Sequence, residues 1–130
     1  MKNSVVHFEI YADDVDRLEQ FYKGLFDWTI ESPPGMDYHM IKTVDTGADN
    51  RPVAGGVNGG MLKRPAGYGV SAWVSYVNVE SLDRSVARAK ELGAKVTKDK
   101  SAVPGMGWFA MLTDPQGNDF ALWQTDSTAK

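Results

Sequence analysis

Residues 13–25 read DDVDRLEQFYKGL, and residues 80–92 read ESLDRSVARAKEL. A shift of 67 residues superposes the two stretches, including the Asp-Arg pair that each contains. The same shift lays VVHFEIYA, at residues 5–12, over AWVSYVNV, at residues 72–79. Because one offset relates both a strand pattern and a helix pattern, the sequence predicts a duplicated structural unit.

Each half begins with a strand that is followed by a helix. The first strand alternates between a mixed face and a purely apolar face, and the apolar face consists of Val6, Phe8, Ile10 and Ala12. The first helix has an acidic start and an apolar stripe that is expected to lie on this strand face, formed by Val15, Leu18, Tyr22, Leu25 and Phe26. The second helix is predicted to begin near Ser81 and to stop at Gly93, which suits a left-handed cap.

Three short strands are predicted after each helix, separated by turns that contain Pro or Gly. They lie near residues 28–31, 38–44 and 53–61 in the first half, and near residues 95–97, 107–112 and 119–124 in the second. The sequence therefore predicts an α+β fold with two βαβββ modules in a single domain, residues 1–130. The modules span about residues 4–61 and 70–124, and a linker at residues 62–69 joins them.

Composition excludes several classes of protein. The chain has 130 residues and no Cys, so disulfides, thiolate zinc sites and cysteine nucleophiles are ruled out. Its net charge is −3 and its Lys and Arg residues are scattered, which argues against a nucleic-acid partner. No run of about 18 apolar residues occurs, and the N-terminal stretch turns acidic early. We therefore expect a cytoplasmic protein with no membrane partner.

Two segments carry a resemblance to a known family. The stretch VHFEIYADDVDRLEQFYKGLFDW, from residue 6, and the stretch PGMGWFAMLTDPQGNDFALW, from residue 104, resemble the vicinal oxygen chelate superfamily. This superfamily includes glyoxalase I, extradiol dioxygenases and bleomycin-resistance proteins, and the resemblance covers about residues 4–124. It implies that the two modules form an eight-stranded cup, with the helices outside and a small-molecule or metal site inside.

The resemblance also implies where a metal would bind. In metal-using members the ligands lie on the first strand of each half, often as His, and on the last strand of each half, as an acid. Carried onto this chain, these positions are His7, Ala54 or its neighbour Gly55, Val74, and Ala121. Only His7 has a side-chain donor, whereas zinc takes at least three protein ligands and iron oxygenases use two His and a carboxylate. The sequence therefore predicts no bound metal or other cofactor.

Two further residues leave an alternative open. Glu9 shares a strand face with His7, and His39 is a possible substitute ligand from a neighbouring strand. A partly desolvated Glu9 carboxyl group would have a raised pKa and would suit a general base. The simpler interpretations are that Glu9 pairs with a cation or faces water, that His7 is hydrogen-bonded in the pocket wall, and that His39 is an ordinary strand histidine.

These observations favour a small-molecule pocket with an aromatic lining. The predicted ligand-binding residues are His7, Glu9, Tyr11, Ala54, Val74, Tyr76, Asn78, Ala121 and Trp123. One hypothesis is metal-free binding of a flat or amphipathic compound, by a protein that forms a homodimer. The other is a lyase, isomerase or dioxygenase-type enzyme that uses His7 or Glu9 in catalysis, with or without a metal held by substitute ligands. Trp73 is interpreted as a core or subunit-interface residue.

Overall fold

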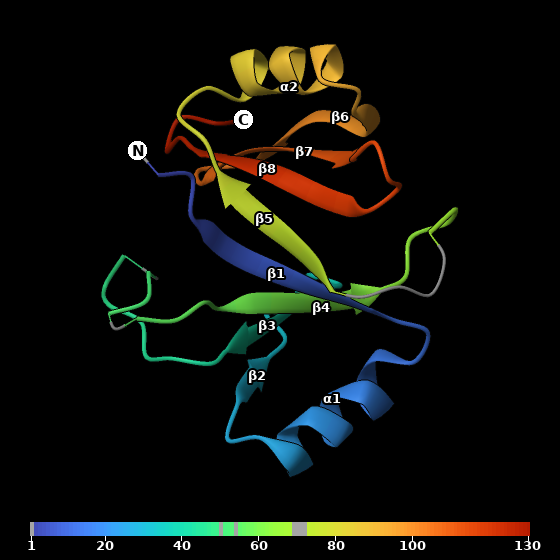
Figure 1. Ribbon diagram of the computed structural model, residues 1–130. Coiled ribbons are helices and arrows are strands. Elements are labelled where there is room, and N and C mark those ends of the chain that lie inside the picture. The colour runs from blue at the N-terminus through green and yellow to red at the C-terminus, as the bar shows by residue number, and fades with distance from the viewer. Residues whose placement is uncertain (1, 50, 54, 69–72) are drawn as a thin grey trace. The chain divides into compact units, whose positions relative to one another are not determined.

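The computed structural model describes residues 2–49, 51–53, 55–68 and 73–130. It contains eight strands and two helices in the order β-α-β-β-β, repeated twice, so the predicted α+β class and both βαβββ modules are confirmed (Figure 1). The chain divides into two compact units. One is His7–Trp73, called the first module here, and the other is Val74–Lys130 together with Met1–Val6, called the second module.

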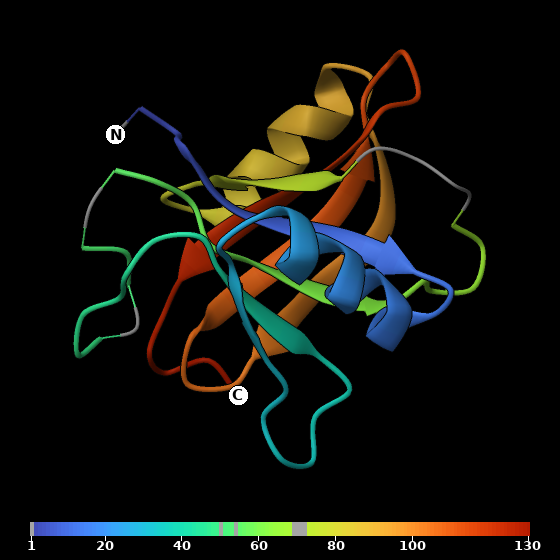
Figure 2. The same ribbon diagram turned by 90° about the horizontal axis from the view of Figure 1, so that it is seen from below.

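The first module builds a four-stranded sheet in the order β2-β3-β4-β1. Strands β1 and β4 are parallel, whereas β3 is antiparallel to both β2 and β4. Helix α1 packs against β2 and β4 on one face of this sheet, as Figure 2 shows. Its elements are β1 (Val5–Ala12), α1 (Val15–Leu25), β2 (Thr29–Glu31), β3 (His39–Lys42) and β4 (Gly59–Lys63).

The core of the first module lies between the apolar face of β1 and helix α1. Its buried side chains come from the strands, and α1 adds part of its apolar stripe, as predicted; the set is Phe8, Ile10, Ala12, Ile30, Ile41 and Met61, with Val15, Leu18 and Tyr22 from the helix. The end of the predicted stripe is wrong, because Leu25 and Phe26 are exposed. The helix ends at Leu25, and Phe26 already has an extended backbone.

The second module repeats this arrangement with strand order β5-β8-β7-β6 and with β5 parallel to β8. Helix α2 packs on β6, β7 and β8 (Figure 1). The Ser81 hydroxyl caps its first turn, and Gly93, at φ +103°, ends it, as predicted. The Ala94 N–H then donates to the Ala89 carbonyl at 2.9 Å, which closes a Schellman motif. The elements are β5 (Val74–Asn78), α2 (Leu82–Glu91), β6 (Lys95–Val103), β7 (Gly107–Thr113) and β8 (Asp119–Thr125).

The last strand of the first module begins later than the sequence predicts. Strand β4 starts at Gly59 rather than near residue 53, and it continues into the predicted linker as far as Lys63. The reason lies in Asn58, whose side-chain oxygen accepts the backbone N–H groups of Thr43 and Val44 at 2.8 and 3.1 Å. The Asn58 side chain thus takes the place of backbone hydrogen bonds between β3 and β4 at this point.

Within the described residues, no helix is long and apolar enough to cross a membrane.

The N-terminal residues belong to the second module rather than to the first. The Asn78 N–H donates to the Ser4 carbonyl at 2.8 Å, and the Asn3 side-chain amide donates to the Asn78 carbonyl at 3.0 Å. Strand β1 therefore runs through the boundary between the two units, which lies between Val6 and His7. That both modules form a single domain stays a prediction.

We expect the two halves of the chain to fold poorly when they are separated. A cut between Ala66 and Gly67 would leave Val74–Lys130 without the residues of Met1–Val6 that cluster with it. Each fragment, expressed alone, should lack a cooperative thermal transition in circular dichroism, whereas co-expression should restore one. A half-chain that melts cooperatively as a monomer would contradict the single-domain prediction.

Candidate functional site

The polar face of β1 carries the first group of predicted site residues. His7, Glu9 and Tyr11 alternate with the core residues of the same strand, so they project from the face opposite helix α1. The His7 side chain keeps 33% of its surface exposed and the Glu9 side chain keeps 12%. The alternation predicted from the sequence is therefore present, and it places an acid and an imidazole side by side in a half-buried setting.

Tyr38 joins these two side chains. Its hydroxyl oxygen lies 2.7 Å from Nε2 of His7, and the two rings stack with an interplanar angle of 14°. The pKa of the Tyr38 phenol is raised well above its usual value, first by burial, then by the negative charge of Glu9 and by a hydrogen bond to the Glu9 side chain, with a further contribution from Tyr11. The phenol is therefore neutral at physiological pH and donates to Glu9.

The direction of these hydrogen bonds follows from the inventory of donors. A neutral phenol has one O–H group, and Tyr38 gives it to Glu9. The bond between Tyr38 and His7 must then run from Nε2–H of His7 to the phenol oxygen. We call this arrangement, His7 to Tyr38 to Glu9, the phenol bridge. Sequence reasoning missed Tyr38, which precedes β3 and lies 31 residues from His7.

The phenol bridge depends on a glycine. Gly60 in β4 pairs with Glu9 in β1 and with Met40 in β3, and a Cβ atom at Gly60 would overlap the ring and hydroxyl of Tyr38. The Tyr38 ring thus occupies the space above the Gly60 backbone. A glycine in a strand can mark such a close approach. The Gly-Gly pair at residues 59–60 was therefore the feature of the sequence that indicated a side chain packed over β4.

The strand pairing also corrects the predicted repeat. In the second module, Tyr76 pairs with Ala121. The residue 67 positions before Tyr76 is Glu9, and in the first module Glu9 pairs with Gly60. The counterpart of Ala121 is therefore Gly60, and the prediction that Ala54 or Gly55 takes this place was wrong. Ala54 itself lies outside the described residues. Gly60 likewise offers no side-chain donor.

His39 does not join the polar face of β1. It pairs with Met61, a core residue under helix α1, so its side chain projects from the helix face of the sheet. There its Nδ1 atom lies 2.9 Å from Oε1 of Glu19 in the helix. The hypothesis that His39 is a substitute metal ligand beside His7 was wrong. In the described part of the chain, no three His, Cys, Asp or Glu side chains are grouped so that they could hold a metal ion.

The second group of predicted site residues lies in the second module. Val74, Tyr76 and Ala121 are buried, and Val74 and Ala121 offer no side-chain donor. Trp123 lies against the backbone of Gly107, where a Cβ atom would come within 2.6 Å of its ring. The Asn78 backbone binds the N-terminal residues, as described above. This group is mainly apolar and aromatic, and its role in ligand binding stays a prediction.

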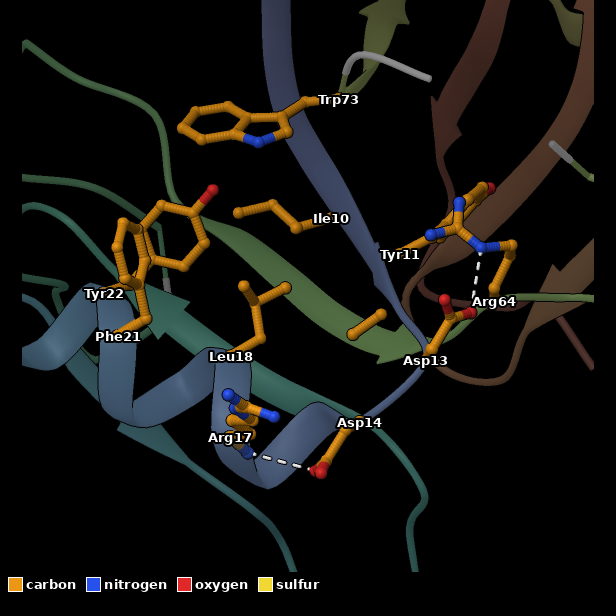
Figure 3. Close-up of a pocket in the computed structure, with 11 residues that line it drawn as sticks. Ile10, Tyr11, Asp13, Asp14, Arg17, Leu18, Phe21, Tyr22, Arg64 and Trp73 are labelled. Carbon is orange, nitrogen blue, oxygen red and sulfur yellow. Dashed lines mark hydrogen bonds and ion pairs between the residues drawn. The ribbon is translucent and has the colours of Figure 1, made fainter. Parts of the chain in front are cut away.

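A cleft of about 470 Å³ opens on the helix side of the first module (Figure 3). Trp73 forms one wall, and its side chain is 45% exposed rather than part of the core. Ile10, Leu18 and Tyr22 line the apolar part, whereas an ion pair of 3.1 Å between Arg64 and Asp13 lies at the other end (Figure 3). The cleft and Glu9 lie on opposite faces of β1.

Comparisons with known proteins agree with this architecture. Residues 6–123 match the family described as a glyoxalase-like domain. CFP32 of Mycobacterium tuberculosis, provisionally named a glyoxylase, is 28% identical over 117 residues, which are 88% of this chain and 41% of that protein. The anthracycline biosynthesis protein DnrV of Streptomyces peucetius is 30% identical over 125 residues, 90% of this chain and 45% of that protein. The chain thus spans less than half the length of these curated relatives.

Solved structures share the fold. Methylmalonyl-CoA epimerase of Streptomyces coelicolor superposes with a TM-score of 0.62 at 17% identity, covering 98% of both chains. A glyoxalase/bleomycin resistance protein/dioxygenase superfamily member from Vibrio splendidus gives a TM-score of 0.63 at 14% identity, covering 95% of this chain and 99% of its own. With the family match over residues 6–123, these findings place the chain in the glyoxalase-like family of the vicinal oxygen chelate superfamily.

Proposed function

We propose that this domain binds an aromatic small molecule without a metal ion. The observation that carries the proposal is the set of donors at the four positions implied by the family. His7 is present, but the other three positions hold Gly60, Val74 and Ala121, none of which has a side-chain donor. A single imidazole competes poorly with water for a transition metal, because stable sites combine several donors in fixed geometry. The residues present therefore do not fit a metal centre.

The chemistry of the predicted lining supports an aromatic ligand. Tyr11 in the first module and Trp123 in the second are partly exposed aromatic side chains, and aromatic rings bind other rings by offset or edge contacts. The relative from S. peucetius is named for anthracycline biosynthesis, and anthracyclines contain fused aromatic rings. Val74, Asn78 and Ala121 stay predicted ligand-binding residues of the second module, and the phenol bridge is the polar group of the first module.

Proton-transfer catalysis is a second candidate function, and one observation favours it. Glu9 is held by a hydrogen bond from Tyr38 within a half-buried setting, which is an arrangement suited to a positioned general base. A lyase or isomerase reaction would use Glu9 in this way. If Glu9→Gln abolishes a measured turnover but keeps the ligand affinity, the result supports an enzyme. If the natural chain binds its ligands but converts none of them, the result supports a binding protein.

Two wider expectations also belong to this proposal. The exposed apolar side chains of the first module, among them Phe21, Leu25 and Trp73, are compatible with the homodimer that the sequence predicts. A cytoplasmic location stays a prediction from composition.

Trp123→Ala should weaken binding of an aromatic probe more than Trp28→Ala does. Trp28 packs beside Tyr22 and Trp73 on the helix side of the first module, away from the predicted lining. We expect Trp123→Ala to lower the affinity for 2-naphthol about tenfold or more in a fluorescence titration, because ring contacts are lost. Trp28→Ala should lower the thermal midpoint, since truncating a packed Trp costs about 3–5 kcal/mol, and should leave the affinity within about twofold. Equal losses of affinity would contradict the predicted lining.

Protein produced without an affinity tag should hold no stoichiometric transition metal, even when zinc, nickel, manganese or iron is supplied during expression. The reason is the donor set, in which His7 stands alone. Elemental analysis should find far less than one metal per chain, and a chelator should leave the melting temperature unchanged. One tightly bound metal per chain that is lost in His7→Ala would overturn the metal-free proposal.

The raised pKa of Tyr38 predicts a loss of stability at high pH. An unfolded Tyr ionises near pH 10, whereas the folded state keeps the Tyr38 proton at that pH. The group therefore contributes nothing to the pH dependence below about pH 10, and it lowers the free energy of unfolding as pH rises further. Denaturant titrations from pH 8 to about pH 11 should show a shallower fall in Tyr38→Phe than in the natural chain. An identical fall in both proteins would contradict the assignment.

A further inference from the structure

The cleft on the helix side of the first module has an aromatic wall. Trp73 is held there by a stacked contact with Phe8, at 5.2 Å between ring centroids, and by an edge contact with Tyr22, at 6.0 Å. Trp73 nevertheless stays 45% exposed, and Phe21, which also lines the cleft, stays 58% exposed. Exposed apolar surface that borders a cleft is typical of a binding site. The wall therefore offers ring surface that a flat ligand can cover.

Helix α1 places a cation beside this wall. Arg17 and Phe21 are four residues apart, so their side chains are neighbours on one face of the helix, about 6 Å apart along its axis. Leu18 and Tyr22 have the same spacing and pack against the core. All four residues line the cleft (Figure 3). A ligand that stacks on the aromatic side chains thus has the Arg17 guanidinium within reach.

The other charged groups of the cleft already have partners. Arg64 forms its ion pair with Asp13, and the Asp14 carboxylate accepts the backbone N–H of Arg17 at 3.1 Å as the cap of the helix. The positive end of the helix dipole offsets the charge of Asp14 as well. Within the described residues, the Arg17 guanidinium forms no ion pair. A planar guanidinium binds a carboxylate through two parallel N–H···O bonds, so Arg17 suits an anionic ligand.

The size of the cleft also suits such a ligand. Its volume of about 470 Å³ falls within the range of small-molecule pockets, roughly 300–1,000 Å³. Ile10 and Leu18 supply apolar surface between the aromatic wall and the charged end (Figure 3). Among the described residues, Tyr11 is the one predicted ligand-binding residue that lines the cleft. The cleft is therefore separate from the phenol bridge, which lies on the other face of β1.

We propose that this cleft is a second binding site, which takes an aromatic carboxylate. The ring of the ligand packs on Trp73 and Phe21, and its carboxylate pairs with the Arg17 guanidinium. A neutral compound of the same shape keeps the ring contacts and loses the ion pair. The inference goes beyond the proposed function, because it concerns the helix face of the first module and a different recognition group.

Two probes of the same shape test the role of charge. 4-Phenylbenzoate carries a carboxylate, and 4-phenylbenzamide replaces it with a neutral carboxamide. The readout is the indole N–H signal of Trp73 in two-dimensional nitrogen–proton NMR, identified by its loss in Trp73→Phe. Because Trp73 lines the cleft and Trp123 does not, this signal distinguishes the cleft from the predicted lining. The natural chain should bind the benzoate about fivefold or more tightly than the benzamide, as expected for an ion pair at a solvent-accessible guanidinium.

Two variants separate the charge from the ring contacts. Arg17→Gln should reduce the preference for the benzoate to about twofold or less, while the affinity for the benzamide changes little. Phe21→Ala should lower both affinities about threefold or more, because a ring contact is lost, and should keep the preference. The fold tolerates this truncation because Phe21 is exposed. The control is Lys23→Gln, which removes an equal charge from an exposed position of the same helix outside the cleft and should keep both affinities.

Four results would overturn the inference. They are equal affinity for the two probes at the Trp73 signal, an unchanged preference in Arg17→Gln, and a Trp73 signal that neither probe moves. The fourth is a Trp73 signal that shifts when the protein is diluted without a probe, since a second copy of the chain would then cover the cleft. If the Trp123 signal titrates while the Trp73 signal stays fixed, the inference fails and the proposed function stands.

Discussion

The parallel pairing of β1 with β4 is the constraint on which the candidate site depends. It brings Glu9 next to Gly60, 51 residues later in the chain, and so defines where Tyr38 finds room. A slip of one residue would exchange the two faces of β1. Phe8 and Ile10 would then turn away from helix α1, and Glu9 would enter the core beneath it. Hydrophobic burial on one face of the sheet thus holds the polar group on the other.

Local patterns in the sequence were sufficient to predict most of the fold. The alternation in β1 and the caps of α2 involve neighbouring residues, whose preferences act without help from distant parts of the chain. The start of β4 escaped prediction because Asn58 competes with the sheet for the N–H groups of Thr43 and Val44. Such a contact joins residues 14 and 15 positions apart through a side chain, and periodicity carries no information about it.

In the candidate site, a difference of one position along the chain decides which side chain contacts His7. Sequence reasoning considered His39, which has a familiar ligand side chain, and overlooked Tyr38 beside it. Neighbouring residues at a strand project to opposite faces: His39 reaches Glu19 of the helix, whereas Tyr38 reaches His7. Residue type alone could not decide between them. The decision required the register of β3 on β4, which depends on contacts made far along the chain.

Gly60 has two physical consequences that reinforce each other. Without a side chain it offers no metal ligand, and it also gives the Tyr38 ring the space it needs. An Asp at this position would collide with Tyr38 and would place a second negative charge opposite Glu9, where like charges destabilise a strand pair. A metal would have to offset that repulsion, yet Val74 and Ala121 supply no further donors. The present arrangement avoids the conflict, because a neutral phenol with a raised pKa satisfies the Glu9 carboxylate without adding charge.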